Sequence, residues 1–144
     1  LLFPDDYINN VTERLNLYQK LGDIEEEEGL LVFENEIIDR FGELPEEAQD
    51  LFNSVRLKWI AKSLGLEKVV MKHRKMIGYF ISDQNSDYFQ TEAFAKILKY
   101  VQFNPKVCRI KEKQTKKGLR LLLTFENISS IEKALKALKE IKNS

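Results

Sequence analysis

Residues 36–45 read EIIDRFGELP, and this stretch decides how the first part of the chain folds. Its apolar residues include Ile37 and Ile38, and the charged residues between the apolar positions point the other way on a helix. Gly42 suits the left-handed position just past a helix end, and Pro45 suits the first turn of a following helix. The stretch therefore predicts an amphipathic helix that ends at Gly42 and another that begins at Pro45.

Helical spacing continues on both sides of this stretch. Asp5 or Asp6 can cap a first helix that ends at Gly22. Asp23 can cap the second helix, whose acidic opening lies favourably at the positive end of the helix dipole. The third helix stops at Gly65. The first part of the chain is thus predicted to be three helices.

After these helices the pattern changes to two pairs of short β-type runs, each pair closed by a basic turn. The predicted strands cover residues 68–71 and 76–81, then 107–113 and 119–125. A helix between the pairs starts at Ser86 or Asp87 and stops before Pro105. The last helix opens with the capping-box spacing of Ser129 and Glu132.

The element order, ααα followed by ββαββα, predicts an α+β fold with helices covering one face of a small, largely antiparallel sheet. We expect one domain over residues 1–144, with a helical part over 1–65 and a ββαββα part over 66–144. A chain of this length buries roughly 70% of its unfolded surface, so it needs no disulfide or metal to fold.

Composition and motifs narrow the function classes. Cys108 is the single cysteine and His73 the single histidine, which argues against a structural zinc site and predicts a buried, inert thiol. No phosphate-binding loop, zinc-protease motif or nucleophile elbow occurs. We therefore expect no enzyme activity and no cofactor in this chain.

The sequence also carries signs of its setting. No apolar run approaches the roughly 20 residues of a membrane helix, and no signal peptide is recognisable. The chain begins with Leu1, so we expect a piece of a longer, cytoplasmic protein without membrane contact.

The zero net charge hides a polarity along the chain. Residues 1–54 hold 15 acidic and 3 basic side chains, a net charge of −12, and residues 55–144 carry the balancing +12. The two halves either attract each other or form separate acidic and basic docking surfaces.

Cations crowd the second predicted hairpin. A possible basic contact surface consists of Arg109, Lys111, Lys113, Lys116 and Lys117. Such cations can contact nucleic acid phosphates or RNA polymerase, or they can simply protect a sheet edge and aid solubility. Aromatic residues are not interleaved with them as a single-strand stacking platform requires.

Residues 33–69 resemble the C-terminal domain of the bacterial transcription-repair coupling factor family (Mfd). The resemblance rests on EIIDRFGELP, then Ala48, Leu51, Arg56, Ala61, Leu64-Gly65-Leu66 and Lys68, with an entry segment Pro4-Asp5-Asp6-Tyr7-Ile8. It covers essentially the whole chain in element order, and its specific residues lie in the first 70.

The resemblance implies a parent protein that translocates on double-stranded DNA, displaces stalled RNA polymerase and recruits the repair protein UvrA. ATP and Mg, in that case, bind motor domains outside these residues. The family's C-terminal domain packs on the UvrA-binding domain of the same polypeptide and masks it. The present chain is accordingly expected to be a regulatory domain.

In the family, acids on the helix ending in DRFG contribute to that contact. The matching positions here are Glu36 and Asp39, and the predicted docking residues also include Arg40 and Glu43. At about 100° per residue, the two acids lie about 60° apart on the helix. The alternative is an ordinary exposed face on which Glu36 pairs with Arg40 four residues later.

Overall fold

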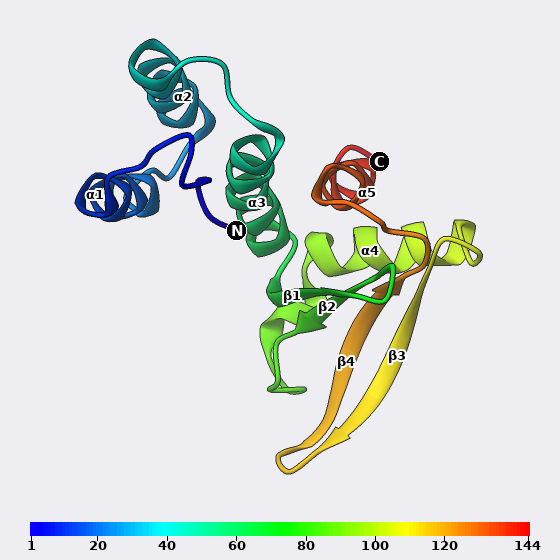
Figure 1. The fold of residues 1–144 in the computed structure, drawn as a ribbon. Helices are drawn as coiled ribbons and strands as arrows, with labels where there is room; N and C mark the ends of the chain where they lie inside the picture. Colours follow the sequence, from blue (N-terminus) through cyan, green and yellow to red (C-terminus); the bar gives the residue numbers. More distant parts are fainter. The chain divides into compact units, whose positions relative to one another are not determined.

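The computed structural model describes residues 1–144, which divide into two compact units, Leu1–Arg56 and Leu57–Ser144. Unit 1 is helical, whereas unit 2 is built on a four-stranded sheet (Figure 1). The long helix α3 (Glu46–Ser63) crosses the boundary, so its last turns belong with the sheet. The predicted α+β class is confirmed.

Unit 1 holds α1 (Val11–Gly22), α2 (Glu27–Phe41) and the first part of α3. Aromatic rings form the centre of its core. The ring of Phe52 lies edge-on to those of Phe3 and Phe33, with centroids 6.1 and 5.9 Å away. Burying such rings is the main source of stability in a unit this small.

Helix α1 begins at Val11 and not at the predicted Asp5 or Asp6. Asn10 caps it by accepting the backbone N–H of Glu13 at 2.9 Å. The preceding residues form a turn that buries an isoleucine side chain, so their apolar spacing serves this turn and not a helix.

Helix α2 begins later than predicted, with Glu26 in an extended conformation at its N-cap. The predicted cap, Asp23, instead closes the end of α1, where its backbone N–H donates to the carbonyl of Lys20 at 3.2 Å. Asp23 has right-handed helical angles, φ −86° and ψ −9°, as the C-cap of α1, whereas an N-cap residue needs an extended backbone. It therefore cannot cap α2.

The sheet of unit 2 has the strand order β1-β2-β4-β3, and each neighbouring pair is antiparallel. The strands are β1 (Leu66–Lys72), β2 (Lys75–Phe80), β3 (Cys108–Thr115) and β4 (Gly118–Phe125). His73 and Arg74, both with positive φ, form the tight turn of the first hairpin, as predicted.

Three helical segments complete unit 2: the short 3-10 helix η1 (Asp87–Gln90), α4 (Glu92–Phe103) and α5 (Ile131–Lys142). Two of their starts differ from prediction. Ser86 caps only η1, and α4 has its own cap, Thr91. Helix α5 is capped by Ser130, so the predicted capping box of Ser129 and Glu132 is wrong. Adjacent serines can cap equally well, and the extended backbone at the second one decides.

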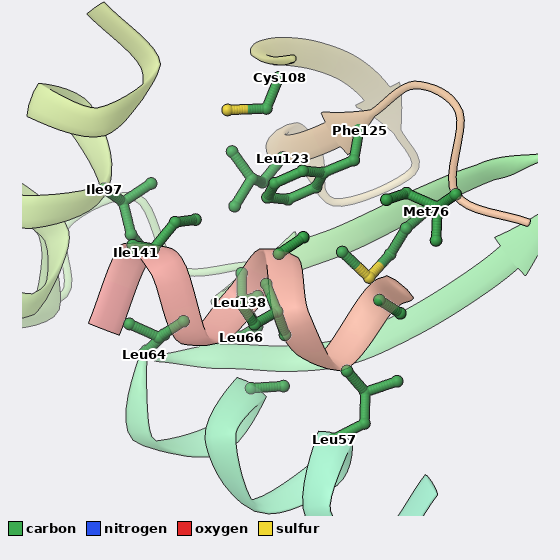
Figure 2. Close-up of a cluster of buried hydrophobic side chains, with 14 of the residues drawn as sticks. Leu57, Leu64, Leu66, Met76, Ile97, Cys108, Leu123, Phe125, Leu138 and Ile141 are labelled. Atoms are coloured by element: carbon green, nitrogen blue, oxygen red, sulfur yellow. The ribbon is translucent and has the colours of Figure 1, made fainter. Parts of the chain in front are cut away.

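Helices α4 and α5 lie on the same side of the sheet, and the β3–β4 hairpin projects beyond them (Figure 1). The core lies between sheet and helices. Figure 2 shows Leu138 and Ile141 of α5 among core side chains that include Met76, Leu123 and Phe125 from the strands. The last turns of α3 close the core with Leu57, Ala61 and Leu64.

Candidate functional site

Helix α2 is anchored through one face and ends where the sequence predicts. Leu30, Phe33 and Ile37 are buried in unit 1. Gly42, with φ +94°, donates its N–H to the carbonyl of Ile38 at 2.8 Å and turns the chain away. The anchored face fixes which side chains the helix presents to solvent.

The exposed side of α2, here called the α2 outer face, is partly apolar. It consists of Leu31, Val32, Asn35, Ile38 and Asp39. The side chains of Leu31, Val32 and Ile38 are 47, 63 and 37% exposed. Leu31 and Ile38 are seven residues apart, as are Val32 and Asp39, so each pair shares one side of the helix. Asp39 therefore shares an exposed side of α2 with Val32, two turns earlier, and Asn35 lies between them.

The four predicted docking residues lie on the last turns of α2 and the loop after it, but their environments differ. The carboxylate of Glu36 forms an ion pair with Lys20 of α1, in which Oε2 lies 3.0 Å from Nζ. Arg40 pairs with Glu13 of α1, and its guanidinium lies 4.8 Å from the centroid of the Phe41 ring. The alternative pairing of Glu36 with Arg40 does not occur.

Asp39 and Glu43 remain without a cation. Both are exposed and neither forms an ion pair. Glu43 also borders a surface depression between the end of α2 and the start of α3. The depression is lined by Glu34, Ile38, Glu43, Leu44, Gln49, Phe52, Asn53 and Arg56. Ile38 belongs both to the α2 outer face and to the lining of this depression, so the two surfaces adjoin.

Unit 1 has few cations and uses them internally. Arg14 pairs with Asp5 at 3.3 Å, and Arg56 reaches Glu27 at 2.9 Å and Glu34 at 3.6 Å. With Lys20 and Arg40 also engaged on acids, every lysine and arginine of unit 1 is neutralised within the unit. Most of its acids, Asp39 included, keep their charge unpaired, which leaves a surface complementary to a basic partner.

The second candidate surface is the side of the sheet opposite α4 and α5, here called the open sheet face. The strand registers and the burial pattern place the following side chains on it: Lys68, Val70, Lys72, Lys75, Ile77, Tyr79, Arg109, Lys111, Lys113, Arg120, Leu122 and Thr124. Every lysine and arginine of the four strands is in this set. The alternate positions point to the side that the helices cover.

A single aromatic ring lies among these cations. The charged groups of Lys68, Lys113 and Arg120 lie 5.4, 6.0 and 5.2 Å from the centroid of the Tyr79 ring. Arg120 also donates to the carbonyl of Phe80 at 3.0 Å. The tyrosine therefore holds neighbouring cations by cation–π attraction.

Of the predicted basic residues, the structure brings Arg109, Lys111 and Lys113 into one row on β3. Lys116 and Lys117 occupy the exposed turn at the hairpin tip. Gln114 and Thr115 separate the row from the two tip lysines along the chain, and all five basic residues are exposed.

Sequence reasoning missed most of the open sheet face. The cations of β1 and β2 share one side with those of β3, but only strand order and register reveal this. It also assigned Ile38 to the buried side of α2, whereas the side chain is 37% exposed. The alternation of lysine and apolar residues within Lys68–Lys72 was the available signal for the open sheet face. No local feature of the sequence marks the exposure of Ile38.

Cys108 and the partly buried Tyr88 of unit 2 have raised pKa values. Burial raises the pKa of the Cys108 thiol to about 11, in agreement with the predicted buried thiol. Burial likewise raises the pKa of Tyr88 to about 12. No group of three or more His, Cys, Asp or Glu side chains is arranged to hold a metal ion. None of the helices combines the length and apolar character needed to cross a bilayer.

Comparison with known proteins assigns the family. The TRCF domain family matches residues 1–91, and the chain belongs to this family. The chain also has the fold seen in the crystal structure of the C-terminal domain of a transcription-repair coupling factor. That likeness has a TM-score of 0.70 and 21% identity, and it covers 99% of this chain and 88% of that one.

Its relatives are transcription-repair-coupling factors of several bacteria. That of Escherichia coli K12 is 40% identical over 68 residues, which cover 47% of this chain and 6% of the relative. That of Rickettsia prowazekii is 26% identical over 141 residues, 98% of this chain and 12% of the relative. The relative from Borreliella burgdorferi is 28% identical over 130 residues, which cover 90% of this chain and 11% of the relative. The chain thus spans about a tenth of the length of these relatives.

Proposed function

We propose that this chain is a non-catalytic regulatory domain of a transcription-repair coupling factor. In this proposal it docks through the α2 outer face on the UvrA-binding domain of its own polypeptide and masks it from UvrA. ATP and Mg serve motor domains elsewhere in the parent, which engages DNA and RNA polymerase. The observation that carries the proposal is Asp39, an exposed acid without an ion pair on a helix side that also exposes the apolar Val32 and Ile38.

An acid in such a setting suits docking on a basic patch. Exposed apolar surface rimmed by charge marks interaction sites, since its burial supplies affinity while the charge selects the partner. Glu36 and Arg40 support the site differently: their bonds to α1 hold the last turns of α2 in place. Asp39 and Glu43 are the residues available to cations of the partner.

Docking within one polypeptide is favoured by the covalent connection between the two domains. A contact within one polypeptide closes at a high effective concentration, so even a weak interface keeps the UvrA-binding surface covered. Opening follows when another partner, such as polymerase-bound motor domains, binds the open form better. Salt weakens the closed form, because part of its stability comes from exposed charges.

The test is binding of the chain to the isolated UvrA-binding domain of its parent. Asp39→Lys should weaken binding by roughly 2–5 kcal/mol if the carboxylate is desolvated at the interface. Glu25→Lys is the matched control. It makes the same charge change on an exposed residue before the other end of α2, roughly 20 Å away by helical rise.

Circular dichroism would establish that both variants fold. Loss of affinity in Asp39→Lys with Glu25→Lys unchanged supports the proposal. Equal affinity of Asp39→Lys and the unsubstituted chain, with both folded, would exclude the α2 outer face as the contact.

A further inference from the structure

The open sheet face has a composition that sheet stability does not require. All seven lysines and arginines of the four strands point to this side, and none points toward the helices. The acids of the strands are Glu67, at the irregularity in β1, and Glu112, which alternates to the other side. The core occupies the other side of the sheet, so the fold itself keeps the strand charges on the open side. Protection of sheet edges and solubility do not require that acids be almost absent from that side. The excess of one sign of charge on the open sheet face suits an anionic partner.

Two carboxylates reach the cations of this face. Glu67 binds Arg120 at 2.7 Å, and Glu126 lies 3.5 Å from Lys75. The other five strand cations, three of them on β3, form no ion pair. Their charge is uncompensated on the protein and is available to a ligand.

The form of the anion follows from what the face lacks. Tyr79 is its single aromatic ring, and three cations already lie within about 6 Å of that ring. Bases of a single strand would have to displace these cations to stack, and there is no second ring for the next base. Rows of cations without a stacking platform fit phosphates held in a regular array, as on the backbone of a duplex.

We propose that the open sheet face binds the phosphate backbone of duplex DNA without sequence preference. The row of Arg109, Lys111 and Lys113 on β3 supplies the main contacts, extended by Lys116 and Lys117 at the hairpin tip. Lys68 and Lys72 on β1 add contacts across the sheet. This function is separate from docking through α2, since it uses a different unit and the opposite charge.

The test is titration of a fluorescent 20-base-pair duplex with the chain at several salt concentrations. The five contacts of β3 and the hairpin tip alone predict a salt slope of about −4.5, equivalent to about 500-fold weaker binding at 200 mM than at 50 mM salt. Contacts by Lys68 and Lys72 would make the slope more negative by about 2. Lys111→Gln with Lys113→Gln should make the slope less negative by about 2.

The matched control is Lys136→Gln with Lys139→Gln. It removes the same charge from exposed positions of α5, which covers the other face of the sheet. Thermal unfolding checks that both double variants fold. If the β3 double variant does not fold, Lys68→Gln tests the same face from β1. This single substitution should make the salt slope less negative by about 1. The control should keep the slope of the unsubstituted chain.

Three results would overturn the proposal. The first is no duplex binding at 50 mM salt. The second is an equal loss of duplex affinity in both double variants, which would show that net charge alone attracts the DNA. The third is tighter binding of a single strand, or of polyglutamate, than of the duplex.

Discussion

Gly65 is the residue on which the junction between α3 and β1 depends. Its φ of +88° is open to glycine and strained for other residues. A Cβ at this position would clash with the ring of Tyr88. The tyrosine in turn donates its hydroxyl to the carbonyl of Leu64. One glycine therefore both ends the helix and leaves room for the ring that closes the junction.

Gly65→Ala should lower the free energy of unfolding by about 2 kcal/mol or more, because left-handed strain and a ring clash add. Gly118→Ala is the control, since Gly118 also has positive φ but a Cβ added there would meet no atom within 4 Å. Urea unfolding of both variants gives the comparison. Equal losses would show that the contact with Tyr88 contributes nothing.

At the scale of elements, hydroxyl groups join segments that are distant in sequence. Tyr100 of α4 donates to a carboxylate oxygen of Glu140 on α5 at 2.9 Å. Burial, aided by that carboxylate, raises the pKa of Tyr100 to about 12. Tyr88 links η1 to the end of α3 and has a similarly raised pKa.

These shifts predict how stability depends on pH. A pKa raised in the folded state means that the unfolded tyrosine, with its ordinary value of 10, ionises first. The contribution of the two tyrosines to the free energy of unfolding is complete below pH 10 and is lost as pH rises toward 12. Urea unfolding at pH 8 and pH 11 should show a smaller decrease for Tyr88→Phe with Tyr100→Phe than for the unsubstituted chain. Identical decreases would contradict the assigned shifts.

Element types could be predicted from the sequence, whereas element starts often could not. Periodicity placed all five α-helices and four strands, because apolar spacing responds to burial over many residues. The starts at Asn10, Thr91 and Ser130 depend on which of several capping residues meets the extended backbone. Glu36, Asp39 and Arg40 lie on α2 and Glu43 in the loop after it, and their role in docking stays a prediction. The bonds of Glu36 and Arg40 to α1 depend on tertiary packing, which the sequence does not show.

At the scale of the whole molecule, charge is divided between the two units. Unit 1 neutralises every lysine and arginine it has and keeps an excess of acids, while unit 2 gathers its strand cations on one face. The sequence showed the imbalance but not the surfaces, because the open sheet face requires the register of all four strands. Two surfaces of opposite charge suit two different partners.

The most direct test of the central claim is an NMR titration of the labelled chain with the UvrA-binding domain of its parent. A chain of 144 residues is small enough for every backbone amide to be followed. We expect the shifts to concentrate between Leu31 and Glu43, on the α2 outer face and the loop after it. Shifts confined to the strands of unit 2, with α2 unaffected, would contradict docking through α2.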